Sequence, residues 1–456
     1  MSTRQLRDLA GRRTLAANNE NEDGEPSIMT RSIAAVALAA LLSLLPIRAE
    51  ADPIPPGGVG QNVEAVGYSN LDDKPGFKMS IQKVGERWYL YIGMLWNEGW
   101  HIVDVTDPGD PKVVKEIEGP PNTATDQMEI ADGKMITALA KISPGWGGDP
   151  AKPFDEGVLI WDMKDPLNPQ KLGQFRTRST GTHRNGYQGG KYMHLSANMR
   201  GFTGNIYVIV DISNPEKPKE AGRWWVPGQR EDETPPAPAA THMHGPPFIV
   251  GNTAYLPYGG AGMIILDISD IAHPRKIGQL QMSPPFAANI GVHTVIPVPE
   301  RKLAFINSEA IAEDCNEPLQ QASVVDIADP AKPRLMALFP LPLPPPDWPI
   351  RSFCERGGRF GPHNQNTLLH NPFVQPQGNL VYLTYFNAGL RIYDVSTPTA
   401  PREVGYFLPP DPTRRYGVFP KGRLVAQTED VLVDTRGYIY ITDKNQGLYI
   451  LRYTGK

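Results

Sequence analysis

Histidines are the residues of this chain with the clearest potential for chemistry, and there are nine among its 456 residues. His242 and His244 stand one residue apart in the segment THMHG (241–245), and His183 stands in a related segment, THRNG (182–186). Imidazole is a common ligand of zinc, copper, iron and nickel. The two segments therefore point to a transition-metal site, provided that the fold brings further ligands to them.

An apolar phrase that ends in aspartate recurs along the chain and indicates the elements that must position these histidines. It reads WHIVD at 100–104, VLIWD at 158–162 and VIVD at 208–211, and later copies follow. The shared residues are Asp104, Asp162, Asp211, Asp267, Asp326 and Asp394. An apolar, β-branched run predicts a buried strand. The aspartate that closes it can accept backbone N–H groups of the following turn.

The repeats predict the fold class. Each unit reads as four short strands in about 50 to 60 residues, which is typical of a propeller blade. The phrase resembles the LVIVD-repeat family of β-propeller proteins from about Val63 onward, and this resemblance implies a fold but almost nothing about a reaction. A degenerate last copy of the phrase stands at 448–453, and counting it with the six others we expect an all-β, seven-bladed β-propeller. The N-terminal strand 64–68 should complete the last blade, because closing the ring removes an exposed edge.

The inner strands of a propeller line its central channel, so residues at their beginnings converge. Four successive units carry a histidine there, and we expect these to bind a transition metal: His183, His242, His293 and His363. His242 is preferred because it aligns with His183, whereas His244 aligns with Asn185. We expect His244 to act as a substitute ligand or as an acid/base group. The expected metal is iron, copper or zinc.

Acidic residues on the neighbouring units complete the predicted site. Glu129 and Glu429 can accept the second N–H of an imidazole and so orient it. The alternative is a water-filled channel in which each histidine has a structural role. The other histidines are expected to be packing or surface residues: His101, His194, His273 and His370. Proline-rich insertions with Trp224, Trp225 and Trp348 are expected to overhang the channel and offer an apolar wall, or else to be spacers.

The start of the chain predicts export. Arg31, the apolar run 32–45 and small residues at Ala49 and Ala51 are typical of a signal peptide over 29–51. Residues 1–28 would be a leader that is not translated if Met29 is the true start, and 52–456 would be the propeller. The apolar run is shorter than the roughly 20 residues of a membrane span. Cys315 and Cys354 fit a disulfide in an oxidising compartment, or two unrelated thiols.

Composition narrows the partners. The net charge is −4 and the body of the chain has no Lys/Arg run, which argues against a nucleic-acid partner. We expect a periplasmic or secreted protein, monomeric or weakly oligomeric, whose metal acts on a small organic substrate. The reaction would be an oxidation, or a metal-assisted hydrolysis or elimination. The alternative is a non-catalytic module that binds protein or glycan on the propeller face.

Overall fold

The structure is a computed structural model that describes residues 52–96, 99–281, 288–368 and 370–455. The predicted leader and the predicted signal peptide over 29–51 lie outside the described residues. The described residues form β-strands, short 3-10 turns and loops, with no α-helix among them. None of them belongs to a helix with the length and hydropathy needed to span a membrane.

The apolar phrases form the third strands of successive antiparallel sheets. The first sheet contains β3 (Gly76–Val84), β4 (Arg87–Met94), β5 (Trp100–Asp104) and β6 (Lys112–Ile117), in chain order. Three later sheets repeat this order. The third unit consists of β12 (Gly181–Gly186), β13 (Tyr192–Asn198), β14 (Ile206–Asp211) and β15 (Lys219–Trp224). The fourth consists of β16 (Phe248–Val250), β17 (Thr253–Pro257), β18 (Met263–Asp267) and β19 (Arg275–Leu280). The fifth consists of β20 (Ile290–Val298), β21 (Leu303–Glu309), β22 (Ala322–Asp326) and β23 (Arg334–Leu338).

Two units depart slightly from this pattern. The second unit contains β8 (Met128–Ala131), β9 (Lys134–Lys141), β10 (Gly157–Asp162) and β11 (Gln170–Phe175). It is joined to the third unit because β9 pairs with β12, and β7 (Thr123–Ala124) also pairs with β9. The sixth consists of β24 (Leu380–Thr384), β25 (Leu390–Asp394) and β26 (Arg402–Leu408), with β1 (Val59–Gln61) on its outer edge. Its inner segment forms an isolated bridge between Gln365 and Leu383 in place of a strand that the structure describes.

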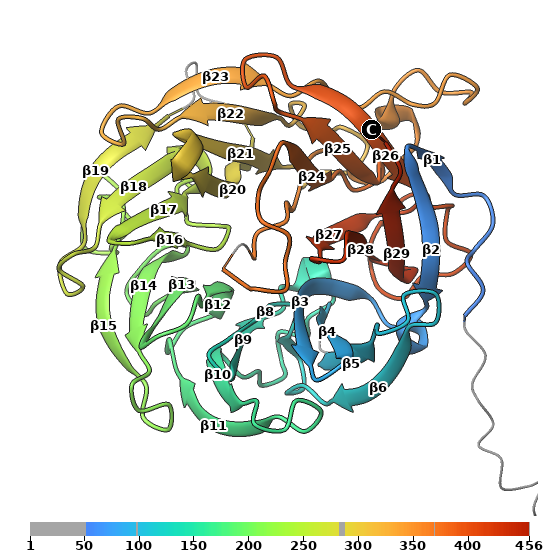
Figure 1. The fold of residues 1–456 in the computed structure, drawn as a ribbon. Helices are drawn as coiled ribbons and strands as arrows, with labels where there is room; N and C mark the ends of the chain where they lie inside the picture. Colours follow the sequence, from blue (N-terminus) through green and yellow to red (C-terminus); the bar gives the residue numbers. More distant parts are fainter. Residues whose placement is uncertain (1–51, 97–98, 282–287, 369, 456) are drawn as a thin grey trace, which may run out of the picture. The chain divides into compact units, whose positions relative to one another are not determined.

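The N-terminal strand completes the last sheet. β2 (Val63–Ser69) pairs antiparallel with β29 (Gly447–Tyr453), which follows β27 (Thr428–Val433) and β28 (Tyr438–Asp443). The blue N-terminal strands accordingly lie beside the red C-terminal ones in Figure 1. This pairing is the one that the sequence predicts, and it covers an edge that would otherwise be exposed. The all-β propeller fold is confirmed, while the count of seven blades and the closed ring stay predictions.

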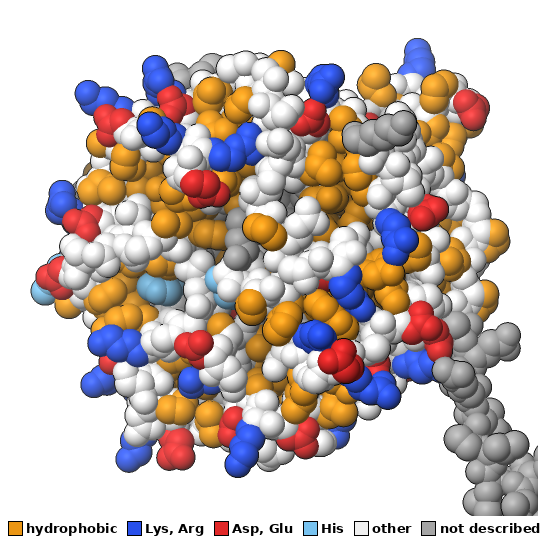
Figure 2. Space-filling view, viewed as in Figure 1, with side chains coloured by type: hydrophobic (Ala, Val, Ile, Leu, Met, Phe, Trp, Pro, Cys, Tyr) orange, Lys and Arg blue, Asp and Glu red, His pale blue; other side chains and the backbone are white. Residues whose placement is uncertain are grey.

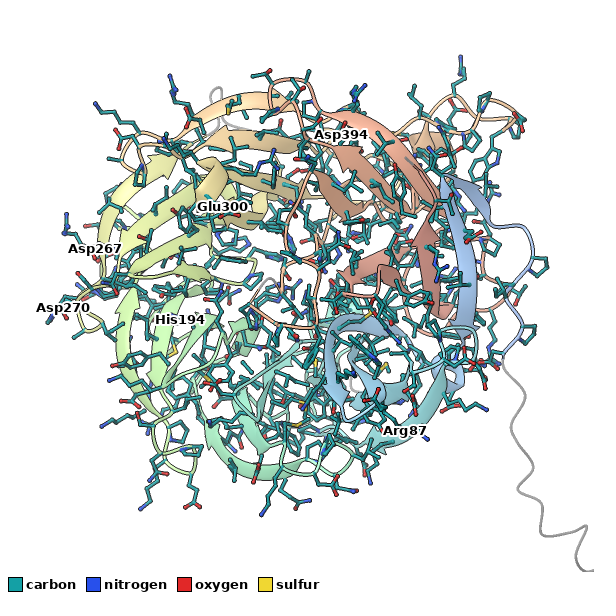
Figure 3. The ribbon with its side chains drawn as sticks, in the orientation of Figure 1. Arg87, His194, Asp267, Asp270, Glu300 and Asp394 are labelled. Atoms are coloured by element: carbon teal, nitrogen blue, oxygen red, sulfur yellow. A yellow bond between two sulfur atoms is a disulfide. The ribbon has the colours of Figure 1, made fainter. Side chains whose placement is uncertain are left out.

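The repeated aspartates hold the turn after each third strand, as predicted. Asp104 Oδ1 accepts the Thr106 N–H at 2.9 Å, and the other five repeat aspartates accept the corresponding N–H two residues on at 2.8 to 2.9 Å. Asp267 and Asp394, labelled in Figure 3, also pair with arginines of the outer strands. Each of these two aspartates therefore holds both the turn and the strand that follows it.

The core lies between successive sheets and is supplied largely by the second and third strands. One cluster, for example, packs Tyr207 and Ile209 of β14 against Leu256 of β17 and Ile264 of β18. The predicted disulfide is confirmed: Cys315 and Cys354 are bonded, with their Cα atoms 5.5 Å apart. Acidic and basic side chains are interspersed over the face in Figure 2. Such a face offers no extended field of one sign for a polyanion.

Candidate metal centre

Four imidazoles from four successive sheets meet around one carboxylate. His183 lies in β12 and His293 in β20, while His244 and His363 lie in the segments that lead to β16 and β24. The carboxylate belongs to Glu309, the last residue of β21. The start of each unit's inner segment therefore supplies one imidazole, and a second strand supplies the acid.

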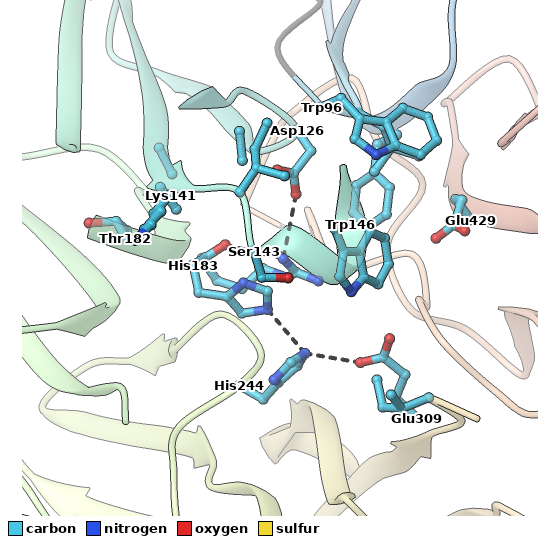
Figure 4. A pocket seen from close by; sticks show the side chains of 18 of the residues that line it. Trp96, Asp126, Lys141, Ser143, Trp146, Thr182, His183, His244, Glu309 and Glu429 are labelled. Atoms are coloured by element: carbon cyan, nitrogen blue, oxygen red, sulfur yellow. Dashed lines mark hydrogen bonds and ion pairs between the residues drawn. The ribbon is translucent and has the colours of Figure 1, made fainter. Parts of the chain in front are cut away.

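The ring nitrogens point at one another and at the carboxylate. His244 Nε2 lies 3.0 Å from His183 Nε2 and 3.0 Å from Glu309 Oε2, and both contacts are among the dashed lines in Figure 4. His293 Nε2 lies 3.5 Å from the same oxygen, and His363 Nε2 lies 3.7 Å from Glu309 Oε1. Three of the Nε2 atoms thus lie within 3.7 Å of the Glu309 carboxylate, and the fourth, that of His183, contacts His244.

The outward ring nitrogens determine which atoms carry protons. His363 Nδ1 lies 2.7 Å from the carbonyl oxygen of Glu429, so it must be the donor. The Thr294 hydroxyl donates to the carbonyl oxygen of His363 at 3.2 Å, so its oxygen accepts from His293 Nδ1 at 2.7 Å. Because a neutral imidazole has one N–H, the Nε2 atoms of His293 and His363 carry lone pairs directed toward Glu309.

This arrangement fits a bound cation. His293 Nε2 and Glu309 Oε2 are buried acceptors 3.5 Å apart with no proton between them. His293 Nε2 has no hydrogen-bond partner, whereas Glu309 Oε2 also lies 3.0 Å from His244 Nε2. Buried acceptors without a donor are costly unless something positive binds them. The ligand atoms of His244, His293 and Glu309 lie within 4.8 Å of one another, close enough to bind one metal ion.

Protonation states at the site are also those that metal ligands need. Burial alone would raise the pKa of the Glu309 carboxyl, but Arg359 and the adjacent histidines outweigh it and hold that pKa well below its usual range. Burial lowers the pKa of His244 to about 4 and lowers those of His293 and His363 well below the usual value. The site therefore combines an ionised carboxylate with neutral imidazoles.

The two predicted orienting acids have different positions. Glu429, in β27, accepts His363 Nδ1 through its backbone oxygen and places Oε2 3.3 Å from the same nitrogen, while its Oε1 contacts Lys444. Glu129 instead accepts the backbone N–H of Tyr187, and burial raises its pKa to about 7. No hydrogen bond or ion pair joins Glu129 to a histidine in the described part of the chain, so only Glu429 lies beside the cluster.

His244, rather than His242, points into the cluster. His242 Nδ1 faces the carbonyl oxygen of Ala239 at 3.4 Å, and its ring centre is 5.7 Å from that of His244. The alignment with β12 misleads because the pairing of β12 with β13 shifts register between Thr182 and Arg184. Such a bulge changes which side chain faces the channel, so two residues that align in the sequence can have side chains that point in different directions.

Glu309 is the candidate ligand that sequence reasoning missed. The predicted site contains residues from the beginnings of inner strands, whereas Glu309 ends a second strand. Because β20 and β21 are antiparallel, Glu309 pairs with Ile290 at the start of the inner strand. The ends of second strands therefore reach the same edge, and an acidic residue at the end of a predicted second strand is the signal that could have found it.

A cavity of about 270 Å³ opens beside the cluster. His183, His244, His363 and Glu309 line one part of it, and an apolar wall lines another. Trp96 and Trp146 belong to this wall and lie on the side away from His183 in Figure 4. The site is thus a polar cluster facing an aromatic surface, an arrangement suited to a small organic molecule.

The tryptophans expected at the mouth have other positions. Trp224 packs against Tyr258, Trp225 against Phe202 and Trp348 against Phe353, with ring centres 5.2 to 6.2 Å apart. Of the described tryptophans, only Trp96 and Trp146 line this cavity. The expected wall therefore exists, but the first two units supply it, because Trp224, Trp225 and Trp348 pack against other aromatic rings instead.

The remaining histidines have the packing or surface positions that the sequence predicts. His194, labelled in Figure 3, is buried in β13 with Nδ1 2.7 Å from the Tyr207 hydroxyl. His101 is buried in β5, and the ring of His370 is largely enclosed. His273 is exposed and pairs with Asp270 at 3.0 Å. None of these four contacts the cluster among the described residues.

Comparison with known proteins identifies the repeat and the fold. The LVIVD repeat matches residues 87–118, 201–225, 248–281 and 374–408. A hypothetical selenium-binding protein from Sulfolobus tokodaii has a similar structure, with a TM-score of 0.50 and 14% identity over 82% of this chain and 85% of that chain. The computationally designed protein Ika8 gives a TM-score of 0.45 and 7% identity over 83% and 96% of the two chains. No curated protein matches the chain.

Proposed function

The chain belongs to the LVIVD-repeat family, and we propose that it is an exported metal-dependent enzyme that acts on a small organic molecule in the cavity beside Glu309. The observation that carries this proposal is the contact between His293 Nε2 and Glu309 Oε2, two buried acceptors 3.5 Å apart with no donor between them. A metal ion satisfies both atoms at once. The disulfide supports export, because such bonds persist in oxidising compartments.

The proposed ligands are His244, His293 and Glu309, and His183 and His363 lie beside them. Ligand atoms about 2.1 Å from one ion lie about 3.0 Å apart at a right angle and about 3.4 Å apart at the tetrahedral angle. The observed separations of 3.0, 3.0 and 3.5 Å match this range. His244 thus takes the ligand role that the sequence predicts for His242.

The donor set defines the chemistry that the metal can supply. Imidazoles with one carboxylate bind zinc in hydrolases and ferrous iron in oxygenases, so a bound metal would activate water or dioxygen. Iron or copper would favour oxidation, and zinc would favour hydrolysis or elimination. The residues around the ligands keep them in place: Glu429 and Thr294 orient His363 and His293, and Arg359 holds Glu309.

Elemental analysis of the exported protein tests the proposal. The protein is expressed with its leader and purified without a metal-affinity tag or chelator, and we expect a stoichiometric transition metal. Replacing His244 or His293 by Ala should abolish it. His242→Ala is the matched control, since it removes a neighbouring imidazole that faces away from the cluster, and it should leave the metal content unchanged.

Two results would contradict the proposal. Metal-free protein with an intact fold would leave the propeller as a binding module for protein or glycan. Loss of the metal in His242→Ala with retention in His244→Ala would reverse the assignment of the two histidines. The identity of the metal then selects between oxidation and hydrolysis.

A further inference from the structure

Arg184 is a buried cation beside the cluster whose donors are largely unused. It lies in β12, is 4% exposed and lines the cavity. Its Nη1 donates to the carbonyl oxygen of His183 at 3.1 Å, and Asp126 Oδ2 is 3.6 Å away, beyond hydrogen-bond distance. A guanidinium has five N–H donors. Among the described residues it makes this one hydrogen bond, and its remaining N–H donors are available to a molecule in the cavity.

A second donor on the same cavity also lacks an acceptor. The indole Nε1 of Trp96 is buried and has no hydrogen-bond partner, and Trp96 lines the cavity. The hydroxyl of Thr182, two residues before Arg184, is likewise buried and unpartnered and lines it. The cavity therefore holds a surplus of donors away from the metal cluster. A ligand that satisfies them must bring hydrogen-bond acceptors, such as oxygens.

The charges around the cavity favour an anionic acceptor. Glu309 is paired with Arg359, and Glu429 is paired with Lys444, so these buried charges cancel. Asp126 is the counter-charge of Arg184, but its Oδ2 lies 3.6 Å from Nη1 and accepts Gln127 Nε2 at 2.8 Å, so it leaves the guanidinium N–H groups free for an anion. A bound metal would add positive charge at the other end of the cavity. An anion beside Arg184 would form the short, charge-assisted hydrogen bonds that guanidinium groups favour.

The rest of the cavity is apolar and limited in size. Phe77 lies with its ring 5.5 Å from the Arg184 guanidinium, and Leu95, Ile142 and Trp146 extend the wall. The volume of about 270 Å³ suits a body of about one aromatic ring. We propose that the substrate is a small apolar carboxylic acid, with its carboxylate on Arg184 and its body against this wall. This inference rests on the proposed function, because it names the substrate class of the same site.

Binding of benzoate and of its neutral counterpart benzamide, measured by isothermal titration calorimetry, tests the inference. Wild-type protein should bind benzoate more tightly than benzamide. Arg184→Gln should weaken benzoate about 10- to 150-fold and leave benzamide unchanged, since a hydrogen bond to a charged group is lost. Lys141→Gln, which removes an exposed cation at the rim of the same cavity, is the matched control and should change benzoate less than about threefold.

Asp126→Asn gives an independent arm in case Arg184→Gln does not fold. It removes the carboxylate that competes for Arg184 while keeping its shape, so benzoate should bind more tightly than to wild type. Weaker benzoate binding in Asp126→Asn would overturn the inference. So would equal affinities for benzoate and benzamide in wild type, or benzoate binding that Arg184→Gln leaves unchanged.

Metal-depleted protein separates this inference from the proposed function. The Arg184 contact does not need the metal, so benzoate should still bind to His293→Ala protein in an Arg184-dependent manner. That result supports the inference even if no metal is ever found. Benzoate that binds only to metal-loaded protein and is indifferent to Arg184→Gln would instead place the carboxylate on the metal, which supports the metal site and overturns the inference.

Discussion

Replacing Lys444 by methionine removes one half of a buried ion pair behind the metal cluster. Lys444 Nζ contacts Glu429 Oε1, and both side chains are 0% exposed. Glu429 Oε2 in turn lies 3.3 Å from His363 Nδ1. Methionine fills the space of the lysine stem without its charge. Lys444→Met therefore leaves a carboxylate buried without its cation, in a region where Glu309 is a second buried acid.

The magnitude follows from the burial of both partners. Removing one partner of a buried pair costs about 3–5 kcal/mol, whereas an exposed pair contributes about 0–1 kcal/mol. The double variant Lys444→Met/Glu429→Gln removes both charges and should recover most of the loss, to within about 2 kcal/mol of wild type. Arg402→Met is the matched control, because it breaks an ion pair with Asp394 in which the arginine is 72% exposed.

Urea unfolding of metal-free protein at pH 7, followed by tryptophan fluorescence, measures these differences from the midpoint and the slope. The double variant should also keep its metal, because His363 Nδ1 bonds to the backbone oxygen of Glu429, which the substitution leaves in place. Two outcomes would refute the reasoning about the buried pair: a loss in Lys444→Met no greater than that in Arg402→Met, or a double variant as unstable as the single one.

Two further predictions concern stability away from the cluster. Cys315→Ala/Cys354→Ala should lower the free energy of unfolding by about 4 kcal/mol, because the bond closes a loop of 39 residues; an unchanged urea midpoint would contradict this. Burial lowers the pKa of His194 to about 4 from the usual 6.5, so the unfolded chain takes up this proton first and stability is lost as the pH falls from about 6.5 to 4. Relative to His194→Gln, wild type should therefore lose up to about 3 kcal/mol of stability between pH 8 and pH 4, and a difference independent of pH would argue against it.

Much of the fold was predictable because it depends on short, repeated patterns. The apolar runs and their aspartates determine the third strands and the turns after them, since both depend on residues two to five positions apart. Cys315 and Cys354 could be paired because the repeat places their loops on one face of neighbouring units. The four units that supply imidazoles could be named for the same reason.

What the sequence could not determine is the direction of side chains at the site. A repeat places His242 and His244 together at the entry of one unit, but the bulge in β12 and the irregular segment before β16 decide that His244 faces the cluster. The aromatic wall came from Trp96 and Trp146 rather than from the proline-rich insertions. Both outcomes depend on local backbone geometry that a repeat alignment treats as identical.

The sequence by itself determined a repeating β architecture that gathers histidines from distant parts of the chain. Only the tertiary structure decided that Glu309 is at their centre, because that position depends on antiparallel pairing of β21 with β20. It also decided which charges compensate one another and which donors of Arg184 remain free. A pattern of residue types records which groups a chain carries, whereas the distances between them arise only when the sheets pack together.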